Sequence, residues 1–162
     1  MRPLLTPLQE AVALAFAPGG ALAQADARYL EREAQQRMAH AVAAAIDERR
    51  PLVAEAGTGV GKTFAYLVPT LLSGKRALVS TATKSLQDQL FLRDLPRLRD
   101  ALQVPIRLAL LKGRASYLCS HRLSLARQSD NLPDRWAVRS LAKIEVWAQT
   151  TPSGDLAELQ GL

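Results

Sequence analysis

Apolar and polar residues along the chain form two kinds of pattern. Six segments place apolar residues three or four positions apart, which is the spacing of an amphipathic helix. These expected helices cover residues 6–17, 31–48, 63–72, 83–102, 117–127 and 135–149. Pro96 predicts a break inside the fourth of them. Three short apolar runs, residues 52–54, 76–80 and 106–111, have the length and composition of buried strands.

The first expected strand leads into a glycine-rich segment and then a helix. The segment reads Glu55-Ala56-Gly57-Thr58-Gly59-Val60-Gly61-Lys62-Thr63. It fits the phosphate-binding pattern Gly-x-x-x-x-Gly-Lys-[Ser/Thr] except that Ala56 replaces the first glycine. Glycines allow a tight turn and a close backbone approach to phosphate, and the backbone N–H groups ahead of a helix hold anions.

Two side chains of this segment predict ATP and Mg²⁺ as cofactors. Lys62 places a point charge on the β- and γ-phosphates, and the Thr63 hydroxyl ligates Mg²⁺. We therefore expect cofactor contacts from the whole run of residues 56–63, with Lys62 and Thr63 serving phosphoryl transfer. An ordinary glycine-rich turn is the alternative. The order strand, loop, helix, strand, helix, strand predicts an α/β fold, with a parallel sheet and right-handed crossovers, as in part of a RecA-like P-loop domain.

The chain of 162 residues is basic, with a net charge of +6 and an isoelectric point near 10.0. Residues 107–143 hold eight Lys or Arg against two Asp, so this segment alone accounts for the net charge. It is either a solvated basic face or a nucleic-acid surface. The single cysteine, Cys119, and the lack of a long apolar stretch favour a cytoplasmic protein without a membrane span. We interpret residues 1–25 as a short helix and a turn, not a secretion signal.

Several blocks resemble the iron–sulfur superfamily 2 DNA helicases of the DinG/YoaA type, which are XPD-like. Ala56 followed by Gly57-Thr58-Gly59 is similar to helicase motif I, and Glu55 before it is typical of this branch. The block Arg32-Glu33-Ala34-Gln35-Gln36-Arg37-Met38 resembles the segment that precedes motif I. The resemblance implies that Gln35 hydrogen-bonds the adenine edge, a task that suits an amide because it both donates and accepts.

Two further blocks extend the resemblance towards DNA and the cluster. Residues 80–90 resemble motif Ia, which implies that Thr81 and Thr83 contact the DNA backbone, while an N-cap is a second role for Thr83. Residues 111–119 are similar to the block carrying the first cluster cysteine, which implies an iron ligand at Cys119. Lys112 and Arg114, which belong to the basic segment, are expected to contact DNA. Residues 147–159 resemble the stretch before the second cluster cysteine.

The resemblance implies the amino-terminal portion of a 5′ to 3′ ATP-dependent DNA helicase. The expected domains are residues 1–30, an N-terminal helix and turn, residues 31–111, the partial ATP-binding domain, and residues 112–162, the start of an α-helical iron–sulfur domain. The implied cofactors are ATP, Mg²⁺ and a 4Fe–4S cluster, and the implied partners are single-stranded DNA and replication or repair proteins. We expect no membrane partner.

One feature of these helicases is missing, and two other functions stay open. The sequence contains no Asp-Glu-x-His box, because its one Asp-Glu pair, Asp47-Glu48, is followed by Arg49-Arg50. Without that box we expect weak nucleotide binding and negligible hydrolysis. A different P-loop phosphotransferase, such as a small kinase, is one alternative. A non-catalytic nucleotide- or nucleic-acid-binding module is the other.

Overall fold

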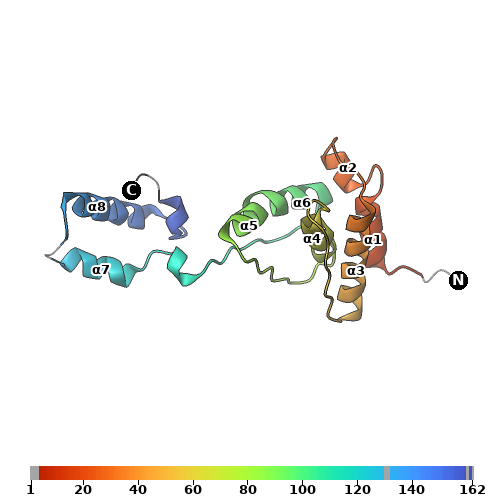
Figure 1. Cartoon of the computed structure of the whole chain (residues 1–162), viewed down its shortest axis with the longest axis horizontal. Coiled ribbons are helices and arrows are strands. Elements are labelled where there is room, and N and C mark those ends of the chain that lie inside the picture. Colours follow the sequence, from red (N-terminus) through yellow and green to blue (C-terminus); the bar gives the residue numbers. More distant parts are fainter. Residues whose placement is uncertain (1–3, 130–131, 160, 162) are drawn as a thin grey trace. The chain divides into compact units, whose positions relative to one another are not determined.

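The computed structural model describes residues 4–129, 132–159 and 161. The chain divides into two compact units, Met1–Ala109 and Leu110–Leu162. The first unit contains the helices α1 (Pro7–Phe16), α2 (Ala21–Ala25), α3 (Glu33–Glu48), α4 (Lys62–Leu72), α5 (Lys84–Gln89) and α6 (Leu95–Leu102). The second contains α7 (Ser120–Gln128) and α8 (Arg135–Thr150) (Figure 1).

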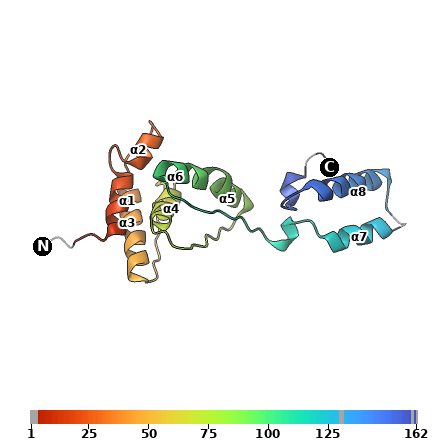
Figure 2. The same ribbon diagram turned by 180° about the vertical axis from the view of Figure 1, so that it is seen from behind.

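The core of the first unit lies where α1, α3 and α4 pack side by side, as both views of the ribbon show (Figures 1 and 2). Helix α1 begins at a capping box, in which Thr6 and Gln9 each accept a hydrogen bond from the other's backbone N–H. Small side chains on α3 allow α4 to approach closely. The fully buried residues include Val12, Phe16, Ala39, Ala43, Ala65, Leu67, Val68 and Leu98.

The helical segment expected over residues 83–102 is helical throughout, but its geometry changes ahead of Pro96. A π-helical turn, Leu90–Asp94, joins α5 to α6, and the N–H of Leu95 donates to the carbonyl of Leu90 five residues back. Proline has no N–H to donate within the helix, and its ring displaces the carbonyl four residues earlier. A wider turn just before Pro96 accommodates both effects, so the expected break is a local change of helix type.

The expected parallel sheet is absent from the part of the chain that the structure describes. Residues 52–54, 76–80 and 106–111 are extended segments outside any strand, and the α/β assignment is therefore wrong for this structure. The apolar side chains of the first two segments are exposed, with 99% for Val53 and 95% for Leu78, and the third segment ends at Leu111, which is 82% exposed. A strand is stabilised by hydrogen bonds and packing from its neighbours, and none of these segments has such a neighbour.

The second unit is a helical hairpin. The segment before α7 and the segment after α8 contact each other around residues 112 and 155. Helices α7 and α8 lie side by side in Figures 1 and 2, and Arg127 on α7 pairs with Glu145 on α8 at 2.8 Å. Tyr117 forms an isolated antiparallel bridge with Asp155. Among the described residues, no helix is long and apolar enough to cross a membrane.

Candidate nucleotide site

The glycine-rich loop ends at the first turn of α4, as the sequence predicts. Gly59 and Gly61 have φ angles of 77° and 88°, which residues with a Cβ rarely adopt. Gly61 is the N-cap of α4, and no side chain caps this end of the helix. The first backbone N–H groups of α4 therefore remain available to an anion.

Lys62 lies at the start of α4 with its ammonium turned back onto the loop. Its Nζ donates hydrogen bonds to the carbonyls of Ala56 at 2.7 Å and Gly57 at 2.9 Å. The residue is exposed, so the charge stays in contact with solvent. This position puts the positive charge inside the turn formed by residues 56–61, where a phosphate group would be attracted to it.

Helix α3 and the residue before it also contact this loop. Gln35 is only 6% exposed, and its Nε2 donates to the carbonyl of Gly61 at 2.9 Å. Arg32, the residue before α3, donates from Nη1 to the carbonyl of Gly59. The two contacts bind the loop to the segment that the sequence analysis linked with adenine recognition. In this structure the Gln35 amide positions the loop, and its contact with adenine stays a prediction.

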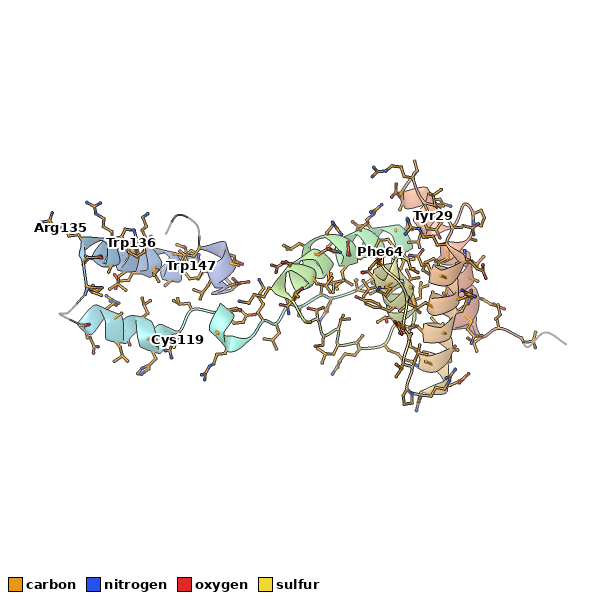
Figure 3. All side chains as sticks on the ribbon, in the orientation of Figure 1. Tyr29, Phe64, Cys119, Arg135, Trp136 and Trp147 are labelled. Carbon is orange, nitrogen blue, oxygen red and sulfur yellow. The ribbon has the colours of Figure 1, made fainter. Side chains whose placement is uncertain are left out.

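A cavity of about 250 Å³ lies beside the loop. Gln35 and Gly61 line it on the side of the loop. The other lining residues include Asp26 and Tyr29 from the turn after α2, Phe64 from α4 and Arg97 from α6. Tyr29 and Phe64 are labelled in Figure 3, which shows them in the region of α2, α4 and α6. Gly61 belongs to both the loop and the cavity lining, and Gln35 contacts the loop and lines the cavity, so the two features adjoin.

The wall of this cavity contains an ion pair that joins distant parts of the sequence. Arg97 Nη2 lies 2.6 Å from Asp26 Oδ2, and the Arg97 guanidinium carbon lies 6.0 Å from the centroid of the Phe64 ring. A hydrogen bond from the Arg28 N–H and the contact with Arg97 lower the pKa of Asp26, so its carboxylate is charged at neutral pH. No local sequence signal identified Asp26, Phe64 or Arg97, because their proximity depends on the packing of α2, α4 and α6.

The two threonines predicted to contact DNA lie at the start of α5. Thr83 is the N-cap, and its hydroxyl accepts a hydrogen bond from the Leu86 N–H at 3.2 Å. The Thr81 hydroxyl donates to the carbonyl of Thr83 at 3.2 Å. The N-cap role that the sequence analysis gave to Thr83 is therefore present, and the contact of either hydroxyl with DNA stays a prediction.

Lys112 and Arg114, which were both predicted to contact DNA, have different surroundings in the second unit. The Lys112 ammonium lies 2.7 Å from Asp155 Oδ2, and the two side chains are 5% and 11% exposed. The Lys112 N–H also donates to the Tyr117 hydroxyl at 2.8 Å. Arg114 is exposed. Lys112 is thus paired inside this unit while Arg114 faces solvent, and the contact of either side chain with DNA stays a prediction.

Cys119 is an exposed free thiol at the N-cap of α7. Among residues 4–129, 132–159 and 161, no group of three or more Cys, His, Asp or Glu could hold a metal ion. A 4Fe–4S cluster requires four ligands, usually thiolates, and the sequence has one cysteine. These residues therefore supply one of the four ligands, and the role of Cys119 as a cluster ligand stays a prediction.

Comparison with known proteins agrees with the motifs. Residues 32–125 match the family described as DEAD/DEAH box helicase. The chain is 46% identical over 147 residues to a protein of Haemophilus influenzae named ATP-dependent DNA helicase YoaA, covering 91% of this chain and 23% of the relative. The Escherichia coli protein of the same name is 46% identical over 143 residues, covering 88% of this chain and 22% of the relative.

A third relative carries another name. The protein of Mycobacterium tuberculosis (strain ATCC 25618 / H37Rv) named ATP-dependent helicase DinG is 38% identical over 174 residues, covering 94% of this chain and 26% of that protein. The chain thus spans about a quarter of the length of the curated relatives it matches. Because the matched family covers more than half of the residues, including the loop, Gln35 and α4, the chain belongs to the DEAD/DEAH box helicases.

Proposed function

We propose that this chain binds MgATP on the loop of residues 56–63, as the nucleotide-binding part of an ATP-dependent DNA helicase. The observation that carries the proposal is the loop itself. Gly59 and Gly61 adopt positive φ angles, the uncapped end of α4 follows, and Lys62 places its ammonium inside the turn. Two relatives are named ATP-dependent helicases, which supports the proposal of ATP as the ligand.

Each side chain of the site has a proposed task. Lys62 neutralises charge on the β- and γ-phosphates, and Thr63 at the first turn of α4 ligates Mg²⁺. Gln35 holds the loop through one N–H, so its carbonyl oxygen and second N–H are the groups proposed to meet the adenine edge. The nucleotide would then lie with its phosphates on the loop and its base towards the cavity.

DNA is the proposed macromolecular partner. The two YoaA relatives are named DNA helicases. In the first unit, Thr81 and Thr83 are proposed to contact DNA phosphates. In the second unit, the exposed cations are proposed to do the same, and they are Arg114, Arg122, Arg127, Arg135, Arg139 and Lys143. Trp136, which is 67% exposed beside Arg135, offers a flat surface for a base (Figure 3). These contacts favour single-stranded DNA.

The finer features of the family resemblance stay predictions. They are the 5′ to 3′ polarity, the cluster ligand at Cys119, replication or repair partners and a cytoplasmic location. The domain boundaries after residues 30 and 111 also stay predictions. The proposed ATP binding depends on the loop of residues 56–63 in the first unit, and Cys119 has no part in it.

Titration of the 162-residue chain with MgATP tests the proposal, with the Lys62→Ala protein as comparison. The loss of a charge-assisted contact to phosphate is expected to weaken binding about 10- to 100-fold, which corresponds to about 1.5–3 kcal/mol. Circular dichroism verifies that both proteins are folded. Equal affinities in two folded proteins would contradict the nucleotide site. Salt-sensitive DNA binding without any nucleotide binding would instead favour the non-catalytic module.

A further inference from the structure

The cavity beside the phosphate-binding loop has a wall formed by a fixed arginine. Arg97 on α6 contacts two cavity-lining residues, Asp26 through an ion pair of 2.6 Å and Phe64 through its ring face at 6.0 Å. Asp26 is itself held, because its Oδ1 accepts a hydrogen bond of 2.9 Å from the Arg28 N–H. The guanidinium is therefore restrained from two sides at the edge of the cavity.

The size and position of the cavity limit what can occupy it. Its volume of about 250 Å³ is below the range of about 300–1,000 Å³ typical of sites that enclose a whole drug-sized ligand. It therefore suits one part of a ligand whose remainder lies elsewhere. Gly61 and Gln35 line the cavity and also belong to the loop site. A nucleotide with its phosphates on the loop would accordingly place its base in this space.

The chemistry of the wall matches a planar heterocycle. A guanidinium group is flat and weakly hydrated, and it stacks on π systems more readily than an ammonium does. Phe64 and Tyr29 add aromatic surface to the same cavity. The carboxylate of Asp26 keeps the guanidinium in place, so its plane is already fixed for stacking on a base.

We propose that Arg97, held by Asp26, is a base-recognition residue against which the base of the bound nucleotide stacks. The inference rests on the proposed function, since it requires the triphosphate to lie on the loop of residues 56–63. It adds a specific consequence. Lys62 contributes to the affinity for any triphosphate, whereas Arg97 contributes only when a base is attached.

Two ligands separate these contributions in titrations of the 162-residue chain. MgATP is titrated directly, and magnesium tripolyphosphate, which has no base or sugar, is measured by competition with MgATP. Arg97→Gln is expected to weaken MgATP binding about 2- to 30-fold, the range that a cation–π contact supplies, and to leave tripolyphosphate unchanged. Arg97→Lys keeps the charge and loses the plane, so it is expected to weaken MgATP in the same way.

Arg99 provides a matched control on the same helix. It pairs with its neighbour Asp100 at 2.8 Å and does not line the cavity. Arg99→Gln removes the same charge from α6 and is expected to change neither ligand's affinity. Asp26→Asn tests the ion pair, and it is expected to weaken MgATP in the same direction as Arg97→Gln. Thermal unfolding of each variant shows that the fold is retained.

The possible results distinguish this inference from the proposed function. If Arg97→Gln weakens both ligands equally, the arginine acts through general charge or folding, and base recognition is overturned. If Arg97→Gln leaves MgATP affinity unchanged while Lys62→Ala weakens both ligands, the inference fails and the proposed function stands. If the wild-type chain binds neither ligand, both fail. Loss of MgATP affinity alone supports Arg97 as a base-recognition residue.

Discussion

The amide of Gln35 lies directly against Gly61, with its Nε2 2.9 Å from the Gly61 carbonyl oxygen. A Cβ built on Gly61 would be 2.1 Å from that same nitrogen. Helix α3 and the phosphate-binding loop are therefore fitted together at a position that only glycine can occupy without displacing Gln35. Two separate effects act at Gly61, the positive φ of 88° and the contact with a buried side chain.

Gly61→Ala is expected to destabilise the protein and weaken MgATP binding. The left-handed backbone costs about 1–2 kcal/mol for a residue with a Cβ. Displacing Gln35 also breaks its hydrogen bond to the loop, which adds about 1 kcal/mol. Chemical denaturation measures the free energy of unfolding, and titration measures the affinity.

Gly59→Ala is the control for that substitution. Gly59 has a similar φ of 77°, but nothing lies within 4 Å of a Cβ placed there. Only the backbone strain is expected, so the loss of stability should be smaller than for Gly61→Ala. Equal losses at the two positions would mean that the contact with Gln35 has no energetic weight.

The second unit depends on the ion pair between Lys112 and Asp155. Lys112→Met leaves a buried carboxylate without its cation, and breaking a buried pair in this way costs about 3–5 kcal/mol. We expect the α7–α8 hairpin to lose its protection in amide hydrogen exchange, with the change confined to residues of the second unit. Replacing both partners, as Lys112→Met with Asp155→Leu, is expected to restore most of the stability.

Arg127→Gln is the control for Lys112→Met, because it breaks an exposed ion pair of the same unit. It removes the ion pair between Arg127 and Glu145, in which the arginine side chain is 64% exposed and the glutamate side chain 30%. Exposed pairs contribute about 0–1 kcal/mol because solvent screens them. Hydrogen exchange should therefore change little in this variant. A larger effect from Arg127→Gln than from Lys112→Met would contradict the role given to the buried pair.

The helices and the loop could be predicted from the sequence because their signals are local. Apolar residues at helical spacing located α1, α3, α4, α7 and α8, and the Gly-Lys-Thr sequence located the start of α4. The sheet could not be predicted in the same way. A short apolar run such as residues 52–54 has strand composition, but a strand also needs neighbours to which it can hydrogen-bond.

The remaining features of the site depend on contacts between distant residues. Asp26 and Arg97 are 71 positions apart in the sequence, and their ion pair exists because α2 packs against α6. Lys112 and Arg114 have the same charge and are two positions apart, yet one is buried and the other exposed. Sequence pattern alone gave them one role, and only the position of Asp155 separates them.

The charge state of Asp26 predicts how its contribution depends on pH. The hydrogen bond from the Arg28 N–H, followed by the contact with Arg97, lowers the pKa of Asp26 below its ordinary value of 3.8. A carboxyl group whose pKa falls on folding stabilises the folded state above that ordinary value and loses the effect as the pH drops through its folded pKa. The difference in melting temperature between wild type and Asp26→Asn should therefore be constant from neutral pH to about pH 5 and shrink below pH 3.8. A difference that grows as the pH falls would contradict this sign.

The isolated chain is expected to bind MgATP and to hydrolyse it no faster than the Lys62→Ala protein does. P-loop enzymes need a carboxylate that holds Mg²⁺ and a group that positions the attacking water. The only adjacent Asp-Glu pair, Asp47-Glu48, lies at the end of α3. Asp47 is twelve positions along this helix from Gln35, which corresponds to about 18 Å. Asp47 accepts a hydrogen bond from Thr6, and Glu48 pairs with Arg50.

Phosphate release over hours, measured for wild type and Lys62→Ala at saturating MgATP, tests this expectation. A rate that is low and equal in both proteins would show that nucleotide binding and hydrolysis are separable. The loop is enough for binding, whereas hydrolysis needs carboxylates that this chain does not place at the loop. Turnover that Lys62→Ala abolishes would instead require a carboxylate of this chain to reach the phosphates. Glu55, directly before the loop, is the residue to replace next, because Glu55→Gln would then remove the activity without changing the affinity for MgATP.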